Sequence, residues 1–247
     1  MRLKEYKLVN YVFAFIIMFG LWQVFAMIIN NPLFPPPYAI ITNIFKTFHS
    51  EIGIHVFYSS NRIILGLLFT LVIGIPVGIL MGYFKKVDIM FSPIIYFNYP
   101  VPKIALLPIV MLIFGLGDLT KIVMIFLITF FPVVVNIRDE VKNIPEEVFY
   151  PMYSLGATNF QIIKEIIFPG ILKAILTSLR IGIGTAISVL FFTENFGTEY
   201  GMGYFIMDAW MRVNYIQMYS GILILSIIGL FLFIIIDILE GIFCPWR

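Results

Sequence analysis

The sequence has few charged residues. Asp, Glu, Lys and Arg make up 12% of its 247 residues, whereas roughly 25% of the residues of a soluble domain are charged. It also has a single cysteine, Cys244, and only two histidines, His49 and His55. One cysteine excludes an internal disulfide and a cysteine-based metal cluster, and histidines spaced six apart lie on nearly opposite faces of a helix. We therefore predict no metal site, and too little charge to cover a water-facing surface.

Apolar residues take the place of the missing charges. They make up 61% of the chain, and the mean hydropathy is +1.00, which is typical of an integral membrane protein. Because a membrane-spanning helix needs about 20 residues, about six helices with short loops use up the chain. The predicted fold class is therefore all-α, a polytopic membrane protein with no room for a separate soluble catalytic domain.

Long apolar runs mark the predicted spans, and the first two spans are uncharged. No charge occurs from Leu8 to Phe45, and the Asn- and Pro-rich segment 30–37 ends the first helix near Ile29. This helix is longer than a signal-peptide core and lacks a small-residue cleavage site, so we interpret it as an uncleaved anchor. The predicted spans are 9–29, 63–84, 102–117, 120–136, 174–195 and 218–239.

Two of these spans carry a further signal. In the second span, four glycines between Gly66 and Gly82 recur at four- and eight-residue spacing, which predicts close contact with a neighbouring helix. Prolines interrupt the third span, and Lys103 lies among its apolar residues. We expect an interfacial segment there, followed by a helix that begins near Pro102.

The Lys and Arg residues of the short loops indicate the orientation. With the N-terminus inside, ten of these residues lie in the cytoplasm and four lie outside. The inner ones are Arg2, Lys4, Lys7, Lys85, Lys86, Arg138, Lys142, Lys164, Lys173 and Arg247, and the outer ones are Lys46, Arg62, Lys121 and Arg212. This bias predicts a cell (inner or plasma) membrane protein with both termini in the cytoplasm, and it places 137–173 there too.

The longest polar interruption in the second half of the chain is Glu146–Lys173. Pro145 favours the start of a helix, because its missing N–H would have no partner in the first turn anyway. Glu146 and Glu147 then stabilise that helix N-terminus through the helix dipole. The helix is predicted to be short and to stop near Gly156.

A second helix is predicted to follow this glycine. Thr158 or Asn159 is a suitable N-cap, and four isoleucines between Ile162 and Ile167 recur at helical spacing, so the helix is amphipathic. Pro169 is expected to end this helix before the fifth span. The segment is thus predicted to form a helix–glycine–helix elbow at the cytoplasmic surface.

Ser154-Leu155-Gly156-Ala157, followed by a polar helix and Phe168-Pro169, resembles the cytoplasmic "EAA" loop of permease subunits of binding-protein-dependent ABC importers. Other stretches are similar to the nitrate/sulfonate/taurine branch of that family. They are Pro102–Pro108, Phe114–Asp118 with Lys121-Ile122, Leu179-Arg180-Ile181, Glu194, Gly201–Tyr204 with Asp208-Ala209, and Asp237. The resemblance implies the type I ABC importer transmembrane fold.

The resemblance also suggests a division of the chain. A type-1 transmembrane domain is expected over 55–241, preceded by an N-terminal helix and outer proline-rich segment (1–54) and followed by a cytoplasmic tail (242–247). One departure from the family pattern concerns the motif's Glu-Ala-Ala, which aligns with Tyr150-Pro151-Met152. Either the helix is shifted by a turn, so that Glu146 and Glu147 supply the acid, or Tyr150 takes its place.

The resemblance implies partners. Two permease copies form the pore in the lipid bilayer, two cytoplasmic ATP-binding subunits drive it, and an extracytoplasmic solute-binding protein delivers the solute; no nucleic acid is involved. No GxxxxGK[ST] motif occurs in the sequence, so no cofactor is expected on this chain, and ATP and Mg would bind the partner ATPase subunit. The residues implied in coupling to that subunit are Glu146, Glu147, Tyr150, Ser154, Leu155, Gly156, Ala157 and Pro169.

Three charged residues are candidates for the translocation path: Lys103, Arg180 and Glu194. A charge at membrane depth is costly and tends to face a cavity, and the Lys103 ammonium would suit an anionic solute. The alternative for Lys103 is a side chain that reaches the interface. For Arg180 we favour an interfacial or helix-pairing role, and for Glu194 a pairing role over a place in the outer gate.

The outer loop 196–217 is rich in glycine and contains Gly201, Gly203 and Asp208. A glycine-rich re-entrant turn there would form an outer gate or a docking site for the binding protein. An interfacial loop anchored by aromatic residues is the alternative.

We therefore predict a permease subunit, not an enzyme, of an ATP-driven importer that works as a homodimer. The predicted solute is a sulfonate- or nitrate-like anion, or a vitamin precursor of the thiamine, pyrimidine or riboflavin type. A membrane enzyme and an ion-coupled secondary carrier are the alternatives. The spans contain no paired carboxylates, histidine cluster or Ser/His pair for catalysis, and no internal repeat typical of carriers.

Overall fold

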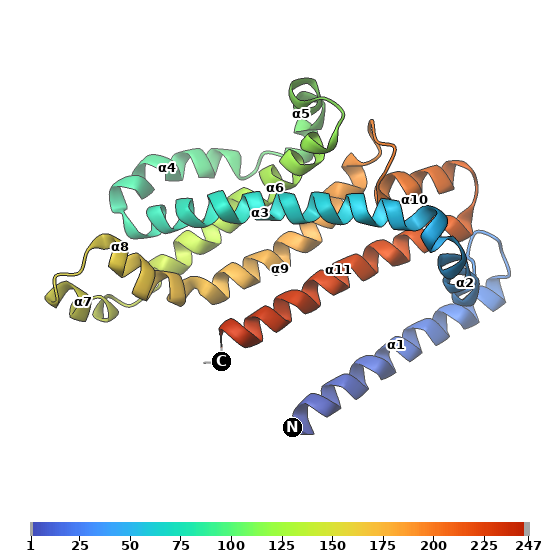
Figure 1. Ribbon diagram of the computed structural model, residues 1–247, viewed down its shortest axis with the longest axis horizontal. Coiled ribbons are helices and arrows are strands. Elements are labelled where there is room, and N and C mark those ends of the chain that lie inside the picture. Colours follow the sequence, from blue (N-terminus) through green and yellow to red (C-terminus); the bar gives the residue numbers. More distant parts are fainter. Residues whose placement is uncertain (1, 245–247) are drawn as a thin grey trace.

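The computed structural model describes residues 2–244, with side chains from Phe13 onwards except those of residues 14 and 15. Within this range it contains helices and no strands (Figure 1). The helices are α1 (Arg2–Ile29), α2 (Pro37–Thr47), α3 (Gly53–Tyr83), α4 (Lys85–Asn98), α5 (Leu107–Phe114), α6 (Asp118–Lys142), α7 (Tyr150–Ser154), α8 (Asn159–Ile162), α9 (Phe168–Thr193), α10 (Met202–Met211) and α11 (Tyr215–Phe243).

Four continuous helices are long and apolar enough to cross a membrane: Pro37–Tyr83, Asp118–Lys142, Asn159–Thr193 and Tyr215–Phe243. The pair α4 and α5 makes a fifth candidate, bent by 82° at its break. Together with α1, whose described apolar part is Ile16–Ile29, these elements correspond to the six predicted spans. The first predicted span ends at Ile29, as the sequence indicates.

The second span begins earlier than predicted. A π-turn, Phe48–Ile52, joins α2 to α3, so that one helix runs on from Pro37 to Tyr83. The prediction placed the start at residue 63 because Arg62 looked like a flanking charge. Arg62 is instead buried and paired with carboxylates inside the bundle, so its charge does not end the span.

The third span is a broken helix pair. The segment expected to be interfacial is the 14-residue helix α4. A turn at 99–102 and a 3₁₀ turn, Lys103–Leu106, then precede α5, which begins at Leu107 instead of near Pro102.

Pro169 does not end the second elbow helix. It lies in the first turn of α9, and helix continues from Asn159 to Thr193. A π-turn, Ile163–Ile167, lies just before it. Such a widened turn accommodates a residue that lacks an N–H and whose ring would collide with the preceding turn of a regular α-helix.

Helices α3 and α6 form the centre of the bundle, and they run in the same direction. Gly66 faces Ile125, and Gly82 faces Val141. Residues later in α3 therefore face residues later in α6, as in a parallel helix pair. The predicted glycine stripe is therefore confirmed as a helix contact. Helices α9 and α11 complete the main apolar core, which includes Leu67.

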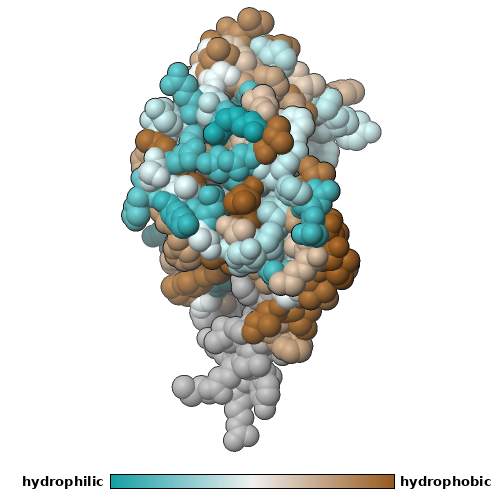
Figure 2. All heavy atoms as spheres, turned by 90° about the vertical axis from the view of Figure 1, so that its right-hand side faces the viewer, coloured by the Kyte–Doolittle hydropathy of each residue, from teal (hydrophilic) through white to brown (hydrophobic). Residues whose placement is uncertain are grey.

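The two ends of the bundle differ. The short helices α7 and α8 lie at one end, which we call the elbow end. The N-terminal part of α3 and helices α2 and α10 lie at the other, the far end (Figure 1). The far end presents many hydrophilic side chains bordered by hydrophobic ones (Figure 2).

Candidate functional site

The turn between α7 and α8 has a fixed backbone geometry. Gly156 has φ of +67°, a left-handed conformation that glycine adopts without strain. The Gly156 N–H donates to the Tyr153 carbonyl at 3.0 Å, and the Ala157 N–H donates to the Met152 carbonyl at 3.0 Å. These two bonds form a Schellman motif that ends α7, which confirms the predicted stop.

Helix α8 begins with a capping box. The Thr158 hydroxyl oxygen accepts a hydrogen bond from the Gln161 N–H at 3.4 Å, and Gln161 Oε1 accepts one from the Thr158 N–H at 2.8 Å. Of the two predicted caps, Thr158 and Asn159, the structure selects Thr158. Residues 145–158, the elbow, are thus held in one shape by local hydrogen bonds on both sides of Gly156.

The elbow region has an exposed apolar face. The exposed fractions are 82% for Leu155, 73% for Phe160 and 55% for Tyr150. On the other side, Phe149 and Met152 pack against an apolar cluster formed by α3, α6 and α9. A firmly seated loop that exposes large apolar side chains at one end of a membrane protein is typical of a protein-binding surface.

Acidic residues flank this face. Glu146 and Glu147 are exposed and form a 3₁₀ turn before α7, while Tyr150 is the first residue of α7. The Ser154 hydroxyl donates to the Tyr150 carbonyl at 3.0 Å and stays within the helix. The carboxylates therefore lie about one turn before the position that the family motif gives to its acid.

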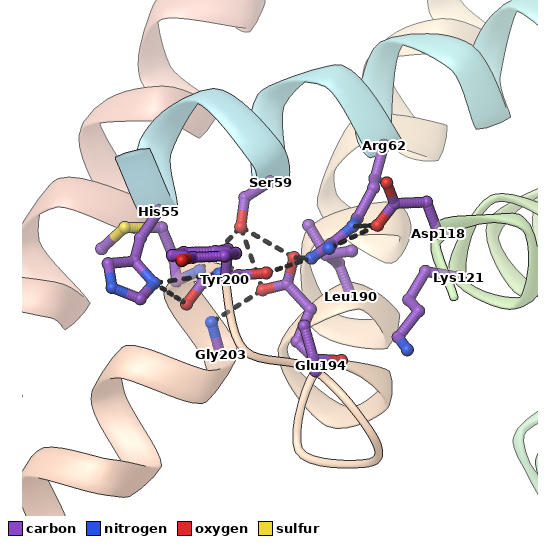
Figure 3. A network of polar contacts seen from close by, with 12 residues as sticks. His55, Ser59, Arg62, Asp118, Lys121, Leu190, Glu194, Tyr200 and Gly203 are labelled. Carbon is purple, nitrogen blue, oxygen red and sulfur yellow. Dashed lines mark hydrogen bonds and ion pairs between the residues drawn. The ribbon is translucent and has the colours of Figure 1, made fainter. Parts of the chain in front are cut away.

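A buried cluster of charged side chains lies toward the far end (Figure 3). Arg62 comes from α3, Asp118 and Lys121 come from α6, and Glu194 follows α9. Arg62 Nη1 lies 2.5 Å from Glu194 Oε1, and Arg62 Nη2 lies 2.5 Å from Asp118 Oδ1. Lys121 is 1% exposed and donates to the Leu116 carbonyl. The two positive charges of this ion cluster balance its two negative charges.

Glu194 is the centre of the cluster. It is fully buried and accepts hydrogen bonds from Arg62, from the Ser59 hydroxyl at 2.8 Å and from the Gly203 N–H at 2.8 Å. The Ser59 hydroxyl oxygen in turn accepts a bond from the Met202 N–H at 2.7 Å. These bonds attach the turn before α10 to both α3 and the end of α9.

Gly201 allows the turn before α10 to approach the Glu194 side chain closely. Its φ is +153°, a conformation that other residues rarely adopt, and a Cβ there would overlap the Glu194 carboxylate. His55 Nδ1 lies 3.0 Å from both the amide nitrogen and the carbonyl oxygen of Gly201. The segment predicted as a loop continues into helix α10, so it is a tight turn followed by a helix.

The structure brings three of the predicted residues, Glu194, Gly201 and Gly203, into one hydrogen-bonded network. Asp208 lies on α10 and pairs with Arg212 at 2.5 Å on the far end. A gating or docking role for these residues stays a prediction.

Lys103 lies at the break between α4 and α5. Its ammonium donates to the carbonyls of Asn98 and Tyr99, and it lies 4.9 Å from the centre of the Phe131 ring. It therefore stabilises the C-terminus of α4. Its predicted place in the translocation path stays a prediction.

Arg180 connects two long helices. It lies on α9 and pairs with Asp237 and Glu240 on α11, the latter at 3.0 Å. This geometry is that of the favoured helix-pairing role. Asp237 and Glu240 thus both pair with Arg180.

Sequence reasoning missed most of the ion cluster. It assigned Arg62 and Lys121 to outer loops, although both are buried, because it treated each charge as the edge of a span. A signal was present: His55, Ser59 and Arg62 recur at helical spacing and so share one helix face. These three residues share one network because α3 begins upstream of them, at Gly53.

Comparisons with known proteins agree on one family. A family model described as "binding-protein-dependent transport system inner membrane component" matches residues 74–246. The taurine transport system permease protein TauC of Escherichia coli K12 is 32% identical over 233 residues, covering 92% of this chain and 85% of TauC. The formylaminopyrimidine transport permease protein ThiX of Halalkalibacterium halodurans is 30% identical over 245 residues, covering 99% of this chain and 98% of ThiX.

A solved structure has the same fold. It is a chain of the MetNI methionine ABC transporter in an inward-facing conformation, with a TM-score of 0.68 and 20% sequence identity. The match covers 76% of this chain and 94% of that chain. The predicted type I importer fold is therefore confirmed.

Proposed function

Because the chain belongs to the family of inner membrane components of binding-protein-dependent transport systems, we propose that it forms the transmembrane pore of an ATP-driven importer as a homodimer. Two cytoplasmic ATP-binding subunits bind the elbow ends of the two copies. An extracytoplasmic solute-binding protein delivers the solute to the far ends. This chain provides the path and the mechanical coupling, and ATP hydrolysis takes place on the partner subunits.

The geometry of the elbow carries this proposal. Its backbone shape is set by the Schellman motif and the capping box, so it stays formed when force is applied to it. Leu155 and Tyr150 point away from the core, with Glu146 and Glu147 beside them. A groove on an ATP-binding subunit can therefore hold the elbow and move it as one unit.

The orientation of the chain follows from the same proposal. The elbow end lies in the cytoplasm, as the Lys and Arg bias of the loops predicts, and both termini lie on that side. In this proposal, the type-1 transmembrane domain spans 55–241, between the N-terminal segment 1–54 and the tail 242–247. Residues 245–247 of the predicted tail lie outside the described residues, and α11 continues to Phe243.

Two solute classes are supported by the relatives. The names of TauC and of the putative SsuC permease of Bacillus subtilis, 29% identical over 234 residues, refer to taurine and aliphatic sulfonates. The name of ThiX refers to a formylaminopyrimidine. We propose a solute from one of these two classes, a small sulfonate-like anion or a vitamin precursor.

The test of the coupling role is Gly156→Val. No atom lies within 4 Å of the position that a Cβ would take, so the substitution acts through the backbone alone. A β-branched residue in the left-handed conformation costs at least about 1–2 kcal/mol, which lowers the equilibrium constant for forming the elbow by about tenfold. We expect ATP-dependent uptake into proteoliposomes to fall by up to about tenfold, while membrane insertion is unchanged.

Gly156→Asn is the matched control, because asparagine tolerates the left-handed conformation and has room for its side chain. We expect it to retain most of the uptake. Normal uptake by Gly156→Val, or equal loss in both variants, would rule out the elbow as the coupling element.

A further inference from the structure

A groove of about 340 Å³ lies between the C-terminal half of α6 and the middle of α9. This volume lies within the range of about 300–1,000 Å³ typical of small-molecule sites. We call it the polar groove. Its lining includes apolar residues from both helices and six polar residues: Tyr99, Thr129, Asn136, Asp139, Ser178 and Thr185.

The polar groove cannot face lipid in the assembled protein. Asn136 and Thr185 are exposed in the single chain although they lie in membrane-spanning helices. The Thr185 hydroxyl is satisfied by the Ile181 carbonyl of its own helix, at 2.9 Å. An exposed amide such as that of Asn136 is costly in hydrocarbon, so such residues face a water-filled path or a protein partner.

The Asn136 side-chain amide has an unused hydrogen-bond acceptor in the groove. Its Nδ2 donates to the Ala174 carbonyl at 3.2 Å and to the Ser178 hydroxyl oxygen at 2.6 Å. Since a carbonyl only accepts, the atom facing Ala174 must be the amide nitrogen. Among the residues that the structure describes, none donates to Asn136 Oδ1, so this oxygen can accept a hydrogen bond from a solute.

The one charge in the groove lining is negative, and it is paired. Among the described residues, Asp139 is the one charged residue of the lining, and Arg138 contacts it at 2.7 Å. Asp88, 3.9 Å from Arg138, pairs with Lys142 at 2.6 Å, so these four charges balance. Arg138 therefore offers no spare charge to an anionic solute, while the paired Asp139 carboxylate still has lone pairs that can accept hydrogen bonds.

Lys103, another nearby cation, is also committed. The Lys103 ammonium has three N–H donors. It bonds two backbone carbonyls at the end of α4 and lies against the Phe131 ring. It therefore satisfies its own helix terminus and does not line the groove.

From these observations we infer that the polar groove binds the transported solute, and that it selects a neutral or cationic amino-heterocycle, such as an aminopyrimidine, over a sulfonate. An amino group can donate to Asn136 Oδ1 and Asp139. A sulfonate would find no free cation and would lie next to a carboxylate. This inference rests on the proposed importer function and decides between its two solute classes.

Charge-selective thiol labelling tests the inference on the complete complex in proteoliposomes. The chain has one cysteine, so Thr185→Cys in a Cys244→Ser background places a single thiol in the groove. Its reaction rates with aminoethyl and sulfonatoethyl methanethiosulfonate are measured and divided by those of a free thiol. We expect the normalised ratio to exceed one, since the charged side chain of the lining is a carboxylate and no cation of the lining attracts the anionic reagent.

Ser226→Cys in the same background is the matched control. Ser226 lies in a different groove, between α9 and α11, and its hydroxyl is likewise bonded to its own helix, at 2.9 Å from the Ile222 carbonyl. We expect this thiol to be unreactive. We also expect 4-amino-2-methylpyrimidine to slow labelling at Thr185→Cys, and taurine at the same concentration not to.

The outcomes separate two kinds of failure. A normalised ratio of one or less, protection by taurine alone, no labelling at Thr185→Cys, or equal labelling of both thiols would overturn the assignment of the groove. ATP-dependent uptake by the wild-type complex is measured in the same vesicles. Its absence would overturn the importer function itself, whereas uptake without the expected labelling would overturn only the groove.

Discussion

At the scale of single residues, the far end depends on charges that are buried but balanced. Moving an ion out of water costs several kcal/mol unless partners surround it. Glu194 meets this condition with Arg62, Ser59 and the Gly203 N–H. Asp118 differs, because its side chain is 48% exposed. The two carboxylates of the ion cluster should therefore contribute unequally to stability.

Glu194→Ala should destabilise the protein strongly. It leaves the Arg62 guanidinium buried with one of its two carboxylates removed, and losing one partner of a buried pair costs about 3 kcal/mol or more. Asp118→Ala should cost about 1 kcal/mol, since water screens that pair. The measurement is the thermal unfolding midpoint of the purified permease in detergent, and equal shifts for the two variants would contradict this account.

A double variant isolates the charge effect from the loss of packing. Arg62→Met with Glu194→Met removes one charge of each sign, and Lys121 and Asp118 remain balanced. Replacing a buried ion pair by apolar groups is often close to neutral. We expect the double variant to unfold at a higher temperature than Glu194→Ala does.

At the scale of helices, the close contact of α3 with α6 depends on missing side chains. Small residues let two helix backbones approach in a membrane, where apolar burial gives little drive for association. A Cβ at Gly78 would lie 2.8 Å from the Ile137 Cβ, which is too close for both helices to stay in place. The contact therefore depends on the absence of a single carbon atom.

Gly78→Ala should therefore lower stability, although alanine is the better helix former. Overpacking of this kind typically costs about 1–3 kcal/mol. Gly241→Ala is the control, because no atom lies within 4 Å of its Cβ position on α11, and it should be neutral or slightly stabilising. Both are measured as thermal unfolding midpoints in detergent; a neutral Gly78→Ala would show that the helices separate freely.

The helix level is also where the sequence was most and least informative. Apolar runs located every long helix, and the glycine spacing predicted that α3 packs closely on a neighbouring helix, which the structure shows to be α6. The start of α3 and the continuous helix through Pro169 were not predicted, and α5 begins at Leu107, a few residues after the predicted start. In the first two cases a charge or a proline looked like a helix end, whereas tertiary partners or a widened turn compensated for it. Such compensation is long-range, so a local pattern does not reveal it.

At the scale of the whole molecule, α3 connects the two candidate sites. Its N-terminal half carries Arg62 of the ion cluster, and its last residue is Tyr83. The Tyr83 ring stacks on Phe149 with centroids 6.4 Å apart, and Phe149 stacks on Tyr153 of α7 at 6.2 Å. One packed helix thus contacts the elbow at one end and the turn before α10 near the other (Figure 1). Coupling between distant sites requires a physical connection of this kind.

Phe149→Ala tests whether this connection transmits the signal. It removes the ring between Tyr83 and Tyr153 but leaves the exposed Leu155 in place. The measured quantity is the rate of ATP hydrolysis by the proposed complex with loaded binding protein, divided by its basal rate. We expect this ratio to fall by about fivefold or more in Phe149→Ala, which is the size of a typical allosteric coupling. Phe149→Tyr keeps the stacked ring and should preserve the ratio. If the ratio is unchanged in Phe149→Ala, or falls equally in both variants, the signal passes from the far end to the elbow by another route.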